Sequence, residues 1–287
     1  RDCAMAEAHA EITRPIGLRL WLSAGWLIAL VLTTLLAPVL APQDPLAQDL
    51  FTSRLPPFWI DGSEPGYPLG SDSLGRDVLS RMMYGGRVAL SVALIAGTLT
   101  CLLGASLGLI AGYFRGWPDI IISRLVDIWM AFPPVLFAIL LIAVLGTGLT
   151  SIIIAIVVID WTRFARVVRA EAIGQGAMDY VASAQVAGHR RFSIMVQEIL
   201  PNVLPTICVL LTLEMGIAVI VEAILSFVNL SISTDQPTWG GMISEGRLSI
   251  HQAWWVLVFP LIILFLTVLS FSQLGEGLKD RFDPVLK

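Results

Sequence analysis

Long apolar stretches alternate with polar segments along most of the chain. Six of these stretches reach or approach the roughly 20 apolar residues that a helix needs to cross the hydrocarbon core of a bilayer. The third is the least regular, because Arg124 and Asp127 lie in its first half and Pro133-Pro134 interrupts it. The pattern therefore predicts an all-α polytopic membrane protein with six transmembrane helices. The predicted helices cover residues 20–41, 88–113, 120–146, 150–168, 203–229 and 254–275.

The polar segments divide the rest of the chain. We expect a cytoplasmic segment at 1–19, an extracytoplasmic loop with an amphipathic segment at 42–87, a second outer loop at 230–253 and a cytoplasmic tail at 276–287. The core domain is expected at 88–275. With the N-terminus inside, most of the 18 Lys and Arg residues fall in cytoplasmic segments. Because basic residues accumulate on the cytoplasmic side of membranes, both termini are predicted to be cytoplasmic.

Composition agrees with a chain that membrane lipid surrounds. Hydrophobic residues make up 56% of the 287 residues and charged residues only 14%, whereas a soluble domain carries roughly 25% charged residues. The three cysteines predict neither a disulfide framework nor a metal site, because their number is odd and two lie in apolar stretches. No basic run is long enough to indicate nucleic acid as a partner.

Small residues recur along one face of the second predicted helix. Gly104, Gly108 and Gly112 are spaced by four, so another helix can approach this face closely. The segment from Gly104 to Gly108 also fits the hydrolase pattern G-x-S-x-G. That pattern needs a strand–turn–helix and a nearby histidine, and the three histidines lie outside the predicted spans. Helix packing is therefore the favoured interpretation, and a membrane-embedded hydrolase is disfavoured.

The cytoplasmic loop at 169–201 has the pattern of a compact projection. Residues 170–187 favour a helix, and Gly188 allows the chain to reverse, because glycine reaches left-handed backbone angles at low cost. A second short helix is expected at Phe192–Ile199, and Pro201 is expected to stop it. A pair of short helices that projects from the membrane suits a protein partner.

This loop resembles the EAA motif of ABC-importer permeases, whose form is E-A-A, three residues, G, nine residues and I-x-L-P. Here Ala182-Ser183-Ala184 precede Gly188, and Glu198-Ile199-Leu200-Pro201 follow at the expected spacing. The loop is closest to the dipeptide/oligopeptide/nickel branch, which typically has D-Y-V-x-A-A-x-x-x-G and I-L-P-N. Asp179-Tyr180-Val181 and Asn202 match that form.

Further signatures of this branch occur in the expected order, and the resemblance covers about residues 18–286. Leu69–Asp77 resembles L-G-T-D-x-L-G-R-D, which marks the C-type subunit of a permease pair. Trp239–Met242 resembles the P-x-W-G loop, and Gly275–Pro284 resembles the tail. The chain departs from the family at Phe227–Ser231, where F-L-G-L-G is usual.

The resemblance implies a permease subunit in a bacterial cytoplasmic (inner) membrane. Its implied partners are a second homologous permease, two ABC ATPases and an extracytoplasmic substrate-binding protein. The chain has no phosphate-binding G-x-x-x-x-G-K-[ST] loop, so ATP and Mg are expected to act on the ATPases, and this chain is expected to bind no cofactor and to catalyse no reaction. The residues implied to couple to the ATPase are Asp179, Tyr180, Ala182, Ser183, Ala184, Gly188, His189, Arg190, Arg191, Leu200 and Pro201.

Acidic residues inside the predicted spans are candidates for a gate or a translocation path, because charge within a membrane is costly and usually functional or paired. Glu214 and Glu222 are eight residues apart, about 80° on a helical wheel, and can face a shared interior. A purely structural role in hydrogen bonding between helices is the alternative. Asp160 is expected to pair with Arg163, one turn further along.

The expected cargo is a short peptide, a dipeptide or oligopeptide, with a nickel chelate or another small solute of the same family as the alternative. An alternative from a different class of protein is a secondary transporter that works alone. No inverted repeat of broken helices is visible in the sequence, which disfavours that class. A stand-alone transporter would also leave the loop at 169–201 without a purpose.

Overall fold

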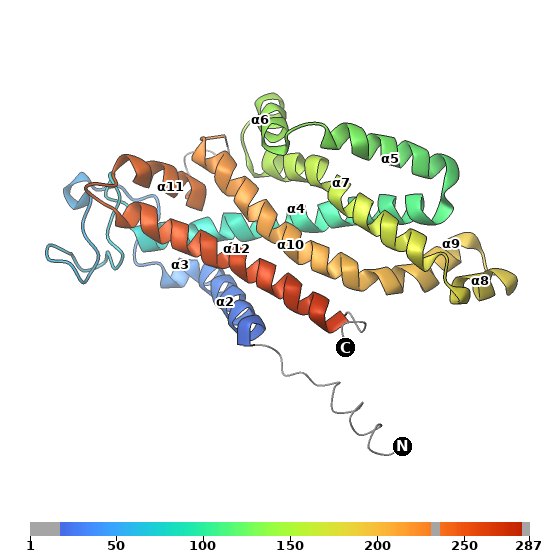
Figure 1. Ribbon diagram of the computed structural model, residues 1–287. Helices are drawn as coiled ribbons and strands as arrows, with labels where there is room; N and C mark the ends of the chain where they lie inside the picture. The colour runs from blue at the N-terminus through green and yellow to red at the C-terminus, as the bar shows by residue number, and fades with distance from the viewer. Residues whose placement is uncertain (1–17, 231–235, 283–287) are drawn as a thin grey trace, which may run out of the picture.

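The computed structural model describes residues 18–230 and 236–282, and this part of the chain folds as packed helices joined by loops (Figure 1). It contains no strand in these ranges apart from one isolated bridge between Ser71 and Asp77. Most of the expected N-terminal segment, up to residue 17, and the end of the expected tail, 283–287, lie outside the described residues. The helices are α2 (Leu18–Leu35), α3 (Ala37–Leu40), α4 (Val78–Phe114), α5 (Gly116–Met130), α6 (Pro134–Leu145), α7 (Leu149–Gln175), α8 (Asp179–Val186), α9 (Arg191–Ile194), α10 (Leu200–Phe227), α11 (Trp239–Leu248) and α12 (Trp255–Phe282).

All six predicted apolar stretches are helical in the structure. By length and composition, three described helices can cross a membrane alone: Val78–Phe114, Arg191–Phe227 and Trp255–Lys279. The pair α5 and α6 adds a fourth if it crosses as one broken span, and α2 is a shorter apolar helix. The apolar part of α7 is interrupted by Asp160, Arg163 and Arg166, and each of these side chains forms an ion pair.

The helix α4 begins earlier than the sequence pattern indicated. Its first residue is Val78, so the amphipathic stretch assigned to the outer loop forms its first turns, and the expected boundary at residue 88 is corrected. Asp77 caps this helix end: its Oδ2 accepts hydrogen bonds from the Ser80 backbone N–H at 2.7 Å and from the Ser80 hydroxyl at 2.6 Å. A capped helix end satisfies orphan N–H groups, so the amphipathic turns continue directly into the span.

The third predicted span, 120–146, consists of two helices rather than one kinked helix. α5 ends at Met130, α6 begins at Pro134, and the two axes are bent by 90°. Pro133 and Pro134 explain the break, because each lacks a backbone N–H and proline disfavours helical angles in the preceding residue.

Pro201 does not stop the second helix of the loop at 169–201, which corrects that expectation. α9 passes through a π-helical turn at Met195–Ile199 into α10, so helix runs from Arg191 to Phe227. The wider turn accommodates Pro201, which cannot donate the backbone hydrogen bond that a regular α-helix needs. The expected helix over 170–187 is also divided, because α7 ends at Gln175 and α8 begins at Asp179.

The glycine face of α4 packs directly on the backbone of α7, as the sequence predicted. A methyl group added to Gly104 would lie 2.3 Å from the Trp161 carbonyl oxygen, and one added to Gly108 would lie 2.7 Å from the Ala165 carbonyl oxygen. At Gly112 the corresponding distance, to the Arg169 carbonyl oxygen, is 2.6 Å. No side chain fits between the helices at these three positions, so the glycines fix the separation of α4 and α7.

This contact predicts the effect of one methyl group. Gly108→Ala should destabilise the protein by about 1–3 kcal/mol, because neighbouring backbone must move apart, and it should lower the melting temperature of the purified protein in detergent. Gly25→Ala is the matched control: no atom lies within 4 Å of its added methyl group, and alanine favours helix over glycine. Equal melting temperatures for the two variants would contradict the proposed role of the glycine face.

Candidate functional site

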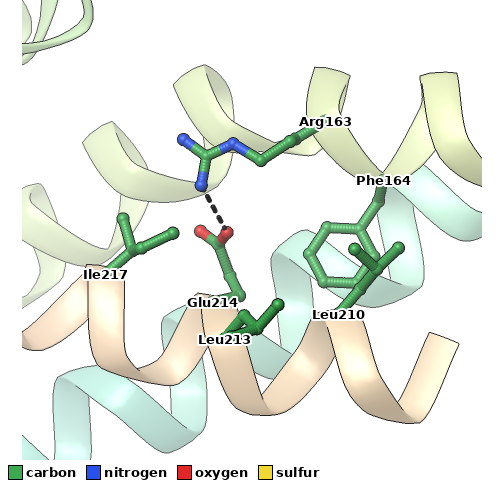
Figure 2. Close-up of a pocket in the computed structure, with 6 residues that line it drawn as sticks. All are labelled: Arg163, Phe164, Leu210, Leu213, Glu214 and Ile217. Carbon is green, nitrogen blue, oxygen red and sulfur yellow. Dashed lines mark hydrogen bonds and ion pairs between the residues drawn. The ribbon is translucent and has the colours of Figure 1, made fainter. Parts of the chain in front are cut away.

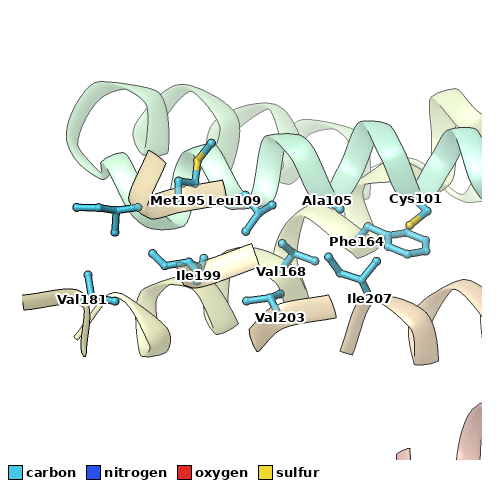
Figure 3. Close-up of a cluster of buried hydrophobic side chains, with 12 residues drawn as sticks. Cys101, Ala105, Leu109, Phe164, Val168, Val181, Met195, Ile199, Val203 and Ile207 are labelled. Carbon is cyan, nitrogen blue, oxygen red and sulfur yellow. The ribbon is translucent and has the colours of Figure 1, made fainter. Parts of the chain in front are cut away.

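The segment from α8 through α9, residues 179–194, projects at one end of the helices and is called the docking unit below (Figure 1). Val181 attaches it to the body of the protein. This side chain is fully buried and belongs to an apolar cluster that joins α4, α7, α9 and the start of α10 (Figure 3). The other buried members of that cluster are Cys101, Ala105, Leu109, Phe164, Val168, Ala172, Ile194, Met195, Ile199, Val203 and Ile207.

A chain of polar contacts ties the docking unit to the adjoining helix ends. The Tyr180 hydroxyl donates to Gln175 Oε1 at 2.8 Å and lies 3.3 Å from Asn202 Nδ2, a donor. Asn202 also donates to the Glu198 carbonyl oxygen at 2.7 Å. Burial raises the pKa of Tyr180 above its usual range, so the neutral phenol is retained. Tyr180 thus joins α7, α8 and α10.

Gly188 makes the reversal between α8 and α9. Its φ is +82°, in the left-handed region that glycine adopts without steric cost. The His189 N–H donates to the Ala184 carbonyl oxygen at 3.2 Å, and the Gly188 N–H donates to the Gln185 carbonyl oxygen at 3.0 Å. This is the Schellman pair of hydrogen bonds that closes a helix C-terminus. The turn leaves His189 and the two arginines after it exposed.

The outer surface of the docking unit combines apolar and basic side chains. Val186 is 90% exposed and Phe192 67% exposed, and the basic run His189–Arg191 lies between them. Ala182 and Ser183 are also exposed, on α8 with Val186. Large apolar side chains on a polar, projecting segment indicate a surface for another protein. The sequence motif does not single out Val186 or Phe192, because neither occupies one of its signature positions.

The predicted coupling residues therefore fall into two groups. Ala182, Ser183, His189, Arg190 and Arg191 are exposed and available to a partner. The others shape or anchor the unit. Asp179 begins α8, Gly188 makes the turn, Tyr180 bonds to its neighbours, Ala184 and Leu200 pack against the apolar cluster, and Pro201 lies at the first turn of α10.

An ion pair fixes α5 to the end of α7 that leads to the docking unit. Arg169 Nη2 donates to Asp119 Oδ2 at 2.8 Å, its Nε donates to the second carboxylate oxygen, and the Ser123 hydroxyl donates to the same side chain at 3.1 Å. The hydrogen bond to Asp119 raises the pKa of Arg169 above its usual value. A two-pronged guanidinium–carboxylate pair is geometrically specific, so it sets how α5 lies on α7.

The predicted Asp160–Arg163 pair is confirmed, and it includes Glu214. Arg163 Nη2 lies 3.1 Å from Asp160 Oδ1, and Nη1 lies 3.3 Å from Glu214 Oε2. Figure 2 shows Arg163 reaching from α7 across to Glu214 on α10. Glu214 is 1% exposed and Asp160 is buried. A cavity of about 90 Å³ adjoins Glu214 and is lined by Arg163, Phe164, Leu210, Leu213, Glu214 and Ile217.

Glu222, the other candidate acid of α10, lies elsewhere. It is fully buried, its Oε1 accepts a hydrogen bond from the Ser226 hydroxyl, and it does not line the cavity beside Glu214. Its neighbour Ala223 is in close contact with α11: a methyl group on Gly240 would lie 2.1 Å from the Ala223 carbonyl oxygen. The structure thus gives the two acids different surroundings.

A second ion cluster, called the outer clamp, joins the two segments predicted to be outer loops. Its Asp72, Arg76 and Arg81 side chains are buried, whereas that of Glu245 is 38% exposed. Arg76 Nε donates to Asp72 Oδ2 at 2.7 Å and its Nη2 donates to Glu245 Oε2 at 2.8 Å. Arg81 binds the same two carboxylates, with Nη1 2.6 Å from Glu245 Oε2. The L-G-S-D-S-L-G-R-D signature of the first loop is thereby fastened to α11. Glu245 was missed, because only the fold reveals that it lies beside this signature.

Asp77 ends that signature, and burial raises the pKa of its carboxyl above the usual range although hydrogen bonds from Ser80 oppose the shift. No group of three or more His, Cys, Asp or Glu side chains among residues 18–230 and 236–282 is arranged to hold a metal ion.

Comparison with known proteins shows the family of this chain. Residues 104–287, which include the docking unit and both α10 acids, match the family described as binding-protein-dependent transport system inner membrane component. The chain belongs to this family. It is 37% identical to the dipeptide transport system permease protein DppC of Haemophilus influenzae over 91% of this chain and 89% of that protein.

Other members of the binding-protein-dependent permease family are similarly close. Identity is 35% to the di/tripeptide transport system permease protein DppC of Pseudomonas aeruginosa, over 91% of this chain and 86% of the relative. It is 37% to the glutathione transport system permease protein GsiD of Pectobacterium atrosepticum, over 79% and 75%. An inward-facing structure of the MetNI methionine ABC transporter shares the fold, with a TM-score of 0.59 and 16% identity over 71% of this chain and 96% of that chain.

As a member of the binding-protein-dependent permease family, the chain is a multi-pass inner-membrane permease subunit with an all-α fold. The described helices suit that assignment, since several are long and apolar enough to cross a membrane. The fold of the solved relative supports the permease architecture and carries no information about cargo.

The outer clamp gives a stability prediction. Asp72→Asn should destabilise the protein by about 3–5 kcal/mol, because it removes one charge from a buried network and leaves two guanidinium groups with one carboxylate. Asp61→Asn is the matched control: Asp61 is exposed in the same loop, and its replacement should change stability by less than about 0.5 kcal/mol. Melting curves in detergent measure both. If Asp72→Asn were as stable as Asp61→Asn, the outer clamp would make no contribution to the stability of the protein.

Proposed function

We propose that this chain forms half of the translocation pathway of an ATP-driven importer of short peptides. The permease family requires a transporter complex, and two of the relatives named above carry dipeptide or di/tripeptide transport in their names. Nickel chelates or other small solutes of the same family are the second candidate cargo. Family membership disfavours a secondary transporter that works alone.

The ATPase is proposed to bind the docking unit, and the observation that carries this proposal is the unit's division into two faces. One face is anchored through Val181 and Tyr180. The other presents Val186 and Phe192 to the outside, with a basic run between them. A rigid attachment on one side and an exposed apolar surface on the other are what a force-transmitting contact needs. ATP and Mg act on the ATPase subunits and not on this chain.

Movement of the ATPases would reach the membrane through two helices. α7 leads into α8, and α9 leads into α10 through the π-helical turn. Both helices also share the apolar cluster that buries Val181. The docking unit therefore moves with α7 and α10 as one body, so closure of the ATPases on ATP would tilt these helices and change access to the pathway.

The remaining partners are proposed from the orientation of the chain. With both termini in the cytoplasm, the docking unit faces the ATPases, and the outer loops at 42–87 and 230–253 face the substrate-binding protein. The outer clamp holds these two loops together through Asp72 and Glu245. A second, homologous permease completes the pathway. Glu214 and Glu222 remain the candidates for a gate or a contact with cargo.

A single exposed side chain tests the proposed ATPase contact. Val186→Glu places a charge on the docking surface without disturbing the fold, because Val186 is 90% exposed. We expect peptide uptake and co-purification of the ATPase to fall at least about tenfold, equivalent to roughly 1.4 kcal/mol of binding. Val186→Ala is the matched control and should retain most of both activities, because it keeps an apolar surface. Wild-type uptake and co-purification by Val186→Glu would refute the contact.

Gly188→Glu provides an independent variant at the turn. Nothing lies within 4 Å of an added Cβ, so the side chain fits, but the left-handed backbone costs about 1–2 kcal/mol for a residue other than glycine. The protein should still be expressed and inserted, whereas transport should be lost, because α8 is displaced and carries a new charge. Normal uptake at normal expression would show that the geometry of this turn is not needed for coupling.

A further inference from the structure

The ion cluster between α7 and α10 has an unequal number of charged groups. Two carboxyl groups, Asp160 and Glu214, face one guanidinium, Arg163. Both carboxyl groups are buried, whereas the Arg163 side chain is 44% exposed. If both acids were ionised, the cluster would hold one uncompensated negative charge in the middle of two packed helices, where such a charge is strongly unfavourable.

The contacts inside the cluster identify where a further positive group is needed. The carboxyl groups of Asp160 and Glu214 both bond to the guanidinium of Arg163, so they lie beside each other at the contact between α7 and α10. An ionised carboxylate only accepts hydrogen bonds, so two ionised groups could not bond to each other. Glu214 Oε2 bonds to Arg163, while Glu214 Oε1 is buried without a hydrogen-bond donor in the described part of the chain. One proton between the two groups satisfies this oxygen.

Among residues 18–230 and 236–282, no second cation lines the cavity beside Glu214. The cavity wall beside Glu214 is apolar apart from Arg163 (Figure 2). The titratable groups near Glu214 on α4 and α10 are the thiols of Cys101 and Cys208, which are weak donors. From α5, Asp127 pairs with Arg166 of α7, and both side chains are more than half exposed.

α12 also packs on α10. Its charged residues Glu276, Lys279 and Arg281 are exposed. A further acid cannot balance the negative charge of Glu214. Within the described residues, then, every element that packs around the cluster either supplies no charge or supplies one that is already paired or exposed.

We propose that Asp160 and Glu214 form a binding site for one exchangeable proton, and that this proton, together with Arg163, fastens α7 to α10. With the proton bound, one acid donates to the other and the remaining negative charge is balanced by the guanidinium. Without it, two adjacent carboxylates repel each other across the helix contact. The site therefore makes the attachment of α7 to α10 depend on pH.

The sign of this dependence follows from which state holds the helices together. The protonated pair is favourable, so the attachment is complete at low pH and weakens as the pH rises and the proton leaves. Because α7 and α10 both carry the docking unit, weakening their contact should reduce transport. The proton site concerns the helix contact itself and does not depend on which solute is carried.

Two amide variants test the proposal. Glu214→Gln and Asp160→Asn each replace the shared proton with a permanent amide donor and leave one carboxylate for Arg163, so each should imitate the protonated pair at every pH. Glu222→Gln is the matched control, because Glu222 is equally buried on the same helix but does not line the cavity. The control should keep the pH dependence of the wild type, whatever its own transport rate.

The first measurement is uptake by the complete transporter in proteoliposomes between about pH 6 and pH 9, a range in which documented buried carboxyl groups lose their proton. We expect wild-type uptake, relative to Glu214→Gln at the same pH, to fall as the pH rises, by up to about tenfold per pH unit, the mass-action limit for one proton. Parallel profiles for the two proteins would overturn the proposal. The proposal would also be overturned if the pH dependence of uptake disappeared when sodium was replaced by a large organic cation. That result would mean that a metal ion occupies the site.

The second measurement is the infrared spectrum of the purified complex, which detects the carbonyl band of a protonated carboxylic acid. The band should be present in the wild type, should lose one component in Glu214→Gln and in Asp160→Asn, and should keep that component in Glu222→Gln. Absence of any difference between wild type and the first two variants would overturn the proton site. This measurement needs no cargo, so its outcome is separate from that of the proposed peptide transport.

Discussion

The backbone contact between α4 and α7 is the constraint on which the rest of the structure depends. In lipid, burying an apolar side chain against another helix gains little, because the acyl chains are equally apolar, so helices associate through close packing and polar contacts. Gly104, Gly108 and Gly112 provide that packing by letting the backbones meet. The same contact positions α7, and α7 carries both the ion cluster with Glu214 and the connection to α8.

Two kinds of attachment then act at different places along α7 and α10. At the docking unit, apolar burial of Val181 and the hydrogen bonds of Tyr180 join the unit to α7 and α10. Nearer the middle of these helices, Arg163 joins them through Asp160 and Glu214. The first kind depends mainly on uncharged groups and the second on charged ones, so the ionic contact is the one whose strength changes most with its charge state.

The sequence predicted features that depend on local spacing. The helix segments, the glycine face of α4, the turn at Gly188 and the Asp160–Arg163 pair all follow from residues within a few turns of one another. Two kinds of feature were not predictable in this way. Pro201 follows a π-helical turn at Met195–Ile199 that no local pattern indicates. Glu245 bonds to Arg76 and Arg81 only because the fold brings distant segments together.

The central claim is that the docking unit, α7 and α10 move as one body when the ATPases close. Spin labels at Gln185 in the docking unit and at Val228, which follows the last residue of α10, test this directly in the complete transporter, in a background without the three native cysteines. The distance between the labels should be the same without nucleotide and with ATP bound. A shift of about one helical turn, 5.4 Å, on ATP binding would contradict the account.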